Sequence, residues 1–213
     1  MKIRLLSMAL LASNVAGAAT SVDGWYTSLF GGYTYIQDNI NTYNNGVFLN
    51  DVGYNGGYNA GGRVGYQSNP LRYELEYTHI QASTSHFAVN YVRPYQVDGS
   101  TSANLFMVNA YYDFPNMLPA ISPFLGVGLG YSYLQTSLST TGPSAATYLS
   151  AHEGAFAYQG TAGITYNFAE NYAVNLAYRY VATNKIDTFG RSYQAQLASA
   201  GAIYHFDGGT YLK

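Results

Sequence analysis

The chain has 213 residues, of which 48% are hydrophobic, 16% aromatic and only 9% charged, so its charged fraction is roughly a third of the usual value. Its 24 Tyr and 23 Gly argue against a helical bundle, since both are poor helix formers, and its aromatic content argues against disorder. The net charge of −2 gives no support to nucleic acid as a partner.

The first 19 residues have the features of a secretory signal peptide. Lys2 and Arg4 precede an apolar stretch from Leu5 to Ala12, and small residues follow at Ala16-Gly17-Ala18. The apolar stretch is shorter than the ~20 residues that a membrane-spanning helix needs. We therefore expect residues 1–19 to be a signal peptide and residues 20–213 to form one exported domain. Because the chain has no Cys, disulfides cannot stabilise that domain.

After the leader, apolar residues recur with the period of two that is typical of β-strands. In the segment 71–77 the odd positions are apolar and the even positions are charged: Leu71, Tyr73, Leu75 and Tyr77 alternate with Arg72, Glu74 and Glu76. The segments 125–131 and 174–180 alternate in the same way. Each segment therefore has one large apolar face and one small or polar face.

Eight segments of this kind are expected to be strands, at about residues 24–37, 56–67, 71–81, 103–114, 122–134, 156–168, 172–182 and 193–206. Short turns follow the second, fourth and sixth strands. Longer polar loops follow the first, third, fifth and seventh, at residues 38–55, 82–102, 135–155 and 183–192. Short turns thus fall at one end and long loops at the other, which is typical of an all-β, antiparallel, up-and-down barrel.

The distribution of large residues indicates that lipid surrounds the barrel. The second face of each strand is too small and too polar to form a hydrophobic core, so the large residues are expected to face outward. An outward apolar face is sensible only in a membrane, where the barrel must also close. Aromatic residues near strand ends fit the girdles of a transmembrane barrel: Trp25, Tyr26, Tyr66, Tyr77, Tyr111, Tyr112, Tyr131, Tyr133, Tyr178, Tyr180 and Tyr204.

The chain resembles the small eight-stranded outer-membrane barrels of Gram-negative bacteria, which include OmpA-like transmembrane domains and opacity-type surface antigens. The resemblance rests on five segments: Gly24-Trp25-Tyr26, Gly65 to Pro70, Asn109 to Pro115, Pro123 to Tyr131 and Gly201 to Phe206. It implies an eight-stranded transmembrane barrel in the cell outer membrane, with periplasmic termini and four surface loops. Such barrels usually end at an aromatic residue, whereas residues 207–213 follow Phe206 here.

Five charged residues are expected to share the lumenal face: Arg63, Arg72, Glu74, Glu76 and Arg179. A hairpin turn centred between Ser68 and Asn69 would place Arg63 opposite Glu74. In OmpA-like barrels a lumenal glutamate at the place of Glu74 pairs with an arginine and blocks the pore, but the matching arginine position is Asn175 in this sequence. The network is either a gate or a structural plug, since an eight-stranded barrel is narrow enough for side chains to fill it.

The four histidines, His79, His86, His152 and His205, show no metal-ligand spacing. Outer-membrane lipid A deacylases of similar size use a His followed two residues later by a Ser, and none of the first three has that Ser. We therefore expect no catalysis, no metal and no cofactor.

The long loops carry aromatic residues that could anchor a partner: Tyr43, Phe48, Phe87, Tyr91, Tyr95, Tyr148 and Phe189. We expect a structural or surface-interaction role, as an adhesin or surface antigen, with outer-membrane lipid and a host or surface ligand as partners. The alternative is a narrow porin-like channel for small solutes, gated by the lumenal charge network.

Overall fold

The computed structural model describes residues 23–37, 40–44, 47–92, 97–114, 121–141, 146–186 and 191–206. The expected signal peptide, residues 1–19, lies outside these ranges. The described residues form ten strands: β1 (Gly24–Ile36), β2 (Ile40–Asn44), β3 (Val47–Tyr54), β4 (Gly57–Ser68), β5 (Leu71–Val89), β6 (Val97–Asp113), β7 (Ile121–Thr140), β8 (Thr147–Asn167), β9 (Tyr172–Ile186) and β10 (Arg191–His205). Within these ranges no helix has the length and apolar character needed to cross a bilayer.

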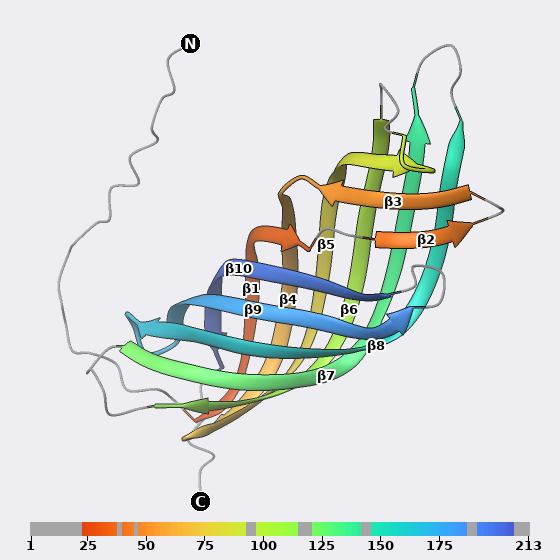
Figure 1. The fold of residues 1–213 in the computed structure, drawn as a ribbon. Coiled ribbons are helices and arrows are strands. Elements are labelled where there is room, and N and C mark those ends of the chain that lie inside the picture. Colours follow the sequence, from red (N-terminus) through yellow and green to blue (C-terminus); the bar gives the residue numbers. More distant parts are fainter. Residues whose placement is uncertain are drawn as a thin grey trace, which may run out of the picture.

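Eight of the strands close into a ring. The neighbours run in the order β5-β4-β1-β10-β9-β8-β7-β6, and a further β5–β6 pairing joins the two ends. Every pairing is antiparallel, and the strands are tilted around the barrel (Figure 1). The predicted all-β, eight-stranded, up-and-down transmembrane barrel is therefore confirmed.

The long loops were predicted without strands, and this prediction was wrong in two respects. Residues 38–55 contain β2 and β3, and β3 pairs with the end of β5. In addition, β5, β6, β7 and β8 continue into the expected loops. The strands β6, β7 and β8 rise beyond the rest of the barrel, and the end of β5 bends over to run beside β3 (Figure 1). The strands were predicted from the alternation of apolar and polar residues. Beyond the lipid band the outward face need not be apolar, so β5 continues through Ser83 and Ser85 without that alternation.

The predicted register of the first hairpin was also wrong, by two residues. The turn lies at Asn69-Pro70, so Ser68 pairs with Leu71 and Arg63 pairs with Glu76 rather than with Glu74. The predicted register would have placed Pro70 in the ladder, where it has no N–H to donate. Because the shift is an even number of residues, every side chain stays on its predicted face.

Large apolar side chains cover the outside of the ring. Aliphatic residues occupy the middle of the strands: Leu29, Val64, Leu75, Val108, Val127, Leu129 and Leu176. Exposed aromatic residues flank them toward the short turns, at Trp25, Tyr66, Tyr112, Tyr166, Tyr172 and Tyr204, and toward the long loops, at Tyr33, Tyr58, Tyr77, Phe106, Tyr131, Phe156 and Tyr180. This is the arrangement of an apolar band between two aromatic girdles.

Two of the predicted girdle residues lie inside instead. Tyr26 and Tyr111 are 1% and 3% exposed and point into the lumen. Each is adjacent to another aromatic residue, Trp25 or Tyr112, and successive strand residues point to opposite faces. Only one member of each pair can therefore contact lipid.

The assignment of the faces predicts an asymmetric response to mutation. Leu75→Arg places a charge on the outward face near mid-strand and should destabilise the barrel by ~2–4 kcal/mol. Asn175→Ser, a polar exchange at a buried lumenal position, should cost much less. The free energy of unfolding is measured by urea titration of the protein folded into lipid vesicles. The folded fraction at each urea concentration is read from heat-modifiable gel migration. Equal costs would contradict the assignment.

Candidate functional site

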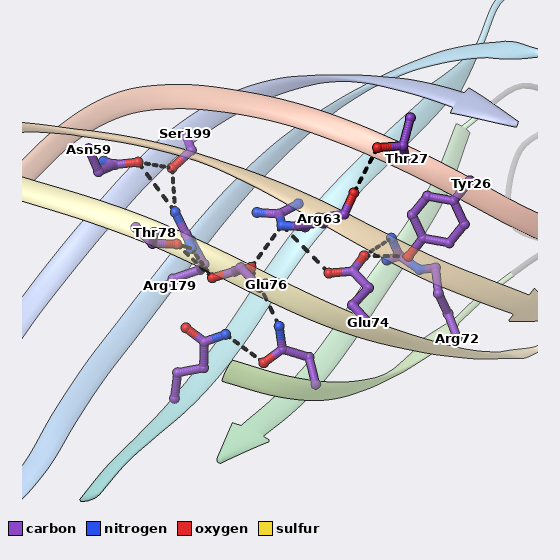
Figure 2. Close-up of polar contacts among 12 residues, drawn as sticks. Tyr26, Thr27, Asn59, Arg63, Arg72, Glu74, Glu76, Thr78, Arg179 and Ser199 are labelled. Carbon is purple, nitrogen blue, oxygen red and sulfur yellow. Dashed lines mark hydrogen bonds and ion pairs between the residues drawn. The ribbon is translucent and has the colours of Figure 1, made fainter. Parts of the chain in front are cut away.

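The lumen contains a chain of alternating charges (Figure 2). Its order is Asp113, Arg72, Glu74, Arg63, Glu76 and Arg179, from the short-turn end toward the middle of the barrel. The successive N–O distances are 3.1, 3.0, 3.5, 2.8 and 2.5 Å. Three arginines and three carboxylates balance, and all six side chains are at most 5% exposed. The burial of each charge is thus offset by one or two opposite charges.

The chain of charges ties opposite walls of the barrel together. Glu76 lies on β5 and Arg179 on β9, which are four places apart in the ring of eight. Arg179 also donates to Thr78 at 3.1 Å, to Ser199 at 3.1 Å and to Asn59 at 3.3 Å. Glu76 receives a further hydrogen bond from Thr78 at 2.9 Å. A single arginine therefore links β4, β5, β9 and β10 across the lumen.

Aromatic rings pack around the guanidinium groups. The ring of Phe30 lies 4.1 Å from the Arg63 guanidinium carbon and 4.5 Å from that of Arg179. Arg72 lies over Tyr111 and Phe124 at 4.6 and 4.7 Å. Such cation–π contacts are strongest when the cation is removed from water. They fill the space between the ion pairs with apolar surface.

Tyr26 completes the chain of charges by donating a hydrogen bond from its Oη to Glu74 at 2.5 Å. Glycines make room for the two inward tyrosines. A Cβ at Gly65 would overlap the Tyr26 ring, and one at Gly126 would overlap the Tyr111 ring. A side chain at either glycine would therefore displace a ring that packs against the arginines.

The structure brings together all five charged residues singled out in the sequence: Arg63, Arg72, Glu74, Glu76 and Arg179. Sequence reasoning missed Asp113 and Tyr26. Asp113 lies four residues after Asn109 on β6, and residues an even number of positions apart on a strand share one face. Its lumenal direction could therefore have been inferred. Its pairing with Arg72 depends on the register between β5 and β6.

The half of the lumen toward the long loops contains a hydrophobic core, contrary to the expectation of a small and polar second face. Its buried core includes Ile36, Ile80, Leu105, Met107, Leu134, Leu138, Val181 and Leu197, which come from strands all around the ring. Buried hydroxyl groups lie among these apolar residues, for example those of Thr101 and Thr136, whose Oγ1 atoms are 3.0 Å apart.

The segment β3 and the end of β5 contribute to the same apolar core. Val52 and Tyr54 of β3 pack in it, and so does Phe87 of β5. Phe87 is 0% exposed, so its predicted role as an anchor for a partner was wrong. The segment 47–54 therefore packs against the apolar core through Val52 and Tyr54.

The tip of β5 carries an exposed aromatic side chain. Val89 and Val92 exchange backbone hydrogen bonds of 2.8 and 2.9 Å around Asn90 and Tyr91. Asn90 accepts a hydrogen bond from the Phe48 N–H at 3.1 Å and donates its own N–H to the Phe48 carbonyl at 2.8 Å. The Tyr91 ring lies 5.5 Å from the Phe48 ring and is 80% exposed. Of the other predicted loop anchors, the side chains of Tyr43, Tyr95, Tyr148 and Phe189 lie outside the described part of the structure.

The histidines are dispersed over the barrel. His79 contacts Asn104 on the outward face, His152 stacks with Tyr133, and His205 is buried near Tyr26. Among the residues that the structure describes, no three His, Asp or Glu side chains gather as metal ligands would.

The ion chain yields a prediction about stability. Glu76→Ala should lower the free energy of unfolding by about 3–5 kcal/mol, because it leaves the buried Arg63 and Arg179 without their nearest carboxylate. Asp98→Ala, at an exposed position near the long-loop end, should change it by less than about 0.5 kcal/mol. Urea titration of both variants in vesicles provides the comparison. A cost below about 1 kcal/mol for Glu76→Ala would show that the ion chain is not needed for stability.

Comparison with known proteins agrees with the architecture. The sequence matches the model of the family described as outer membrane protein beta-barrel domain over residues 4–206. An outer membrane protein of Gluconacetobacter diazotrophicus is 30% identical over 206 residues, covering 84% of this chain and 52% of that protein. The chain spans only 52% to 59% of the length of the curated relatives that it matches.

Two solved structures illustrate the likeness of fold. Neisserial surface protein A superposes with a TM-score of 0.58 at 21% identity, covering 86% of this chain and 97% of that one. The outer membrane protease OmpT of Escherichia coli superposes with a TM-score of 0.55 at 8% identity, with the same coverage of 86% and 97%. The family consists largely of non-enzymatic barrels, but the protease shows that this type of fold can carry catalysis, so the fold alone does not decide function. From the family match and the closed eight-stranded ring, we conclude that this chain belongs to the outer membrane protein beta-barrel domain family and resides in the outer membrane of Gram-negative bacteria.

Proposed function

We propose that this protein is a surface-interaction barrel, an adhesin or surface antigen, that neither conducts solutes nor catalyses a reaction. In this proposal the plugged lumen is a rigid support, and the loops at the long-loop end bind the partner. The observation that carries the proposal is the exposed aromatic tip of β5.

The tip has the properties of a binding anchor. Asn90 and Tyr91 have φ angles of 49° and 67°, which lie in the left-handed region and cost a residue such as Tyr roughly 1–2 kcal/mol. The four-residue turn and the contacts to Phe48 hold Tyr91 in this conformation although its ring is largely in water. Val92 beside it is 69% exposed. A rigid, exposed aromatic residue loses little conformational entropy on binding, which favours its use as an anchor.

The absence of catalysis in this proposal is supported by the positions of the histidines. His79 contacts an asparagine and His152 a tyrosine, so neither is paired with a nucleophile. In this proposal the contact of His86 Nδ1 with the hydroxyl of its neighbour Ser85, at 2.8 Å, is structural.

A narrow channel for small solutes is the second candidate, and the position of the ion chain across the lumen favours it. A gate would require Glu74 to exchange its partner Arg63 or Arg72 for another. The apolar half of the lumen argues against conduction, because ions would still have to pass the core that contains Leu105, Leu134 and Leu138.

Planar-bilayer recording separates the two candidates. Purified, folded protein should give no conductance steps, because both halves of the lumen are filled. Steps whose size changes with Glu74→Gln would instead support the gated channel.

The binding role is tested with bacteria that display the protein. Tyr91→Ser/Val92→Ser removes the apolar tip and should reduce retention of the cells on arrays of immobilised extracellular proteins and glycans at least tenfold, for those ligands that retain wild-type cells. Asp98→Ala serves as the matched control at the same end of the barrel and should bind like the wild type. The proposal fails if wild-type cells bind no better than cells without the barrel, or if removing the tip changes nothing.

A further inference from the structure

A small polar cavity lies inside the barrel at the short-turn end, where the ion chain begins. It is lined by Arg72 and Asp113 of the ion chain and by His205 of β10, and is here called the mouth cavity. His205 takes no part in the ion chain, and its ring lies 5.4 Å from the ring of Tyr26. The mouth cavity therefore brings a histidine next to the outermost arginine of the lumen.

Two nitrogen atoms of these lining residues are buried without a hydrogen-bond partner among the residues that the structure describes. They are Arg72 Nη2 and His205 Nδ1, and the two residues are only 4% and 5% exposed. The other guanidinium nitrogens of Arg72 bind Asp113 at 3.1 Å and Glu74 at 3.0 Å. Burial of a polar atom without a partner is unfavourable, so both nitrogens require a ligand that fits the cavity.

The size and charges of the cavity select that ligand. Its volume is about 10 Å³, which is close to the ~10–15 Å³ that one water molecule needs. A cation would face the Arg72 guanidinium, and an anion would face the Asp113 carboxylate. Water is neutral and can both accept from Arg72 Nη2 and donate to a histidine nitrogen. We propose that the mouth cavity binds one water molecule that bridges Arg72 Nη2 to Nδ1 of a neutral His205, whose proton is on Nε2.

The bridge makes the barrel sensitive to protonation of His205. Protonation would turn Nδ1 from an acceptor into a donor, break the hydrogen bond from the water, and add a second positive charge beside Arg72. The other titratable groups that line the cavity are Tyr26 on β1 and Asp113 on β6, and Asp113 is already bound to Arg72. The remaining lining residues are uncharged: Gln67 on β4, Ser122 on β7, Thr165 and Asn167 on β8, and Ile203 on β10. On β9 the neighbour is Ala173, which packs with Tyr26 and Ile203.

The sign of the pH effect follows from this arrangement. The folded barrel holds His205 neutral, whereas the unfolded chain protonates it below about pH 6.5. Stability from the bridge is therefore fully present above that pH and is lost as the pH falls. The ion chain thus has an acid-sensitive point at its short-turn end. This inference uses the geometry of the lumen and does not depend on the proposed surface-interaction role.

The test compares the wild type with His205→Asn, which keeps an acceptor near the Nδ1 position but cannot titrate. Both proteins are folded into vesicles and titrated with urea at about pH 7.5 and pH 5.5. The unfolding equilibrium constant of the wild type should rise about tenfold more than that of the variant, because the unfolded wild type takes up one proton on His205. His152→Asn is the matched control, since His152 is exposed near the long-loop end, and it should keep the pH dependence of the wild type.

Two measurements on the wild type keep the test open if His205→Asn does not fold. NMR of protein labelled with ¹⁵N in histidine should show His205 neutral at neutral pH, with its proton on Nε2. A high-resolution crystal structure should show one water within hydrogen-bond distance of both Arg72 Nη2 and His205 Nδ1. The same pH dependence in the wild type and His205→Asn, a proton on Nδ1, or a direct contact of the two residues without water would each overturn the proposal.

Discussion

The structure depends on one constraint: in hydrocarbon, every backbone N–H and C=O group must be paired within the protein. A sheet meets this condition only by closing on itself, as β5 and β6 do here. Closure in turn fixes the two faces of every strand, one toward lipid and one toward a lumen that eight strands make narrow. The alternation of large and small residues along the sequence follows from that geometry.

The narrow lumen is filled in two different ways. Near the short turns it holds six balanced charges, with arginines that pack on Phe30, Tyr111 and Phe124. Toward the long loops it holds an apolar core to which β3 contributes Val52 and Tyr54. In the first half each charge has an opposite charge as its partner, and in the second half apolar side chains pack against one another. Our proposal that the barrel supports the loops and does not conduct rests on these two kinds of filling.

Features set by the strand period could be predicted from the sequence, whereas features decided by tertiary contacts could not. The ring of eight strands and the lumenal direction of Arg63, Arg72, Glu74, Glu76 and Arg179 depend only on parity, so an error of two residues in the first hairpin did not change them. Parity is ambiguous for adjacent aromatic residues, which is why Tyr26 and Tyr111 were assigned to the wrong face.

The strands β2 and β3 and the apolar core could not be found in the same way. Beyond the lipid band the outward face carries no apolar signal, so the ends of β5, β7 and β8 resemble loops in the sequence. Phe87 lies at the end of β5 and Val52 in β3, and their burial depends on the pairing of these two strands.

The most direct measurement of the central claim uses the only tryptophan of the chain. In the variant Trp25→Phe/Leu75→Trp the sole indole occupies the outward face at mid-strand. After reconstitution, lipids brominated deep in their acyl chains should quench its fluorescence strongly, its emission should be blue-shifted, and aqueous iodide should have almost no effect. Strong quenching by iodide with little quenching by brominated lipid would mean that this face meets water, and the assignment of the barrel to the membrane would be wrong.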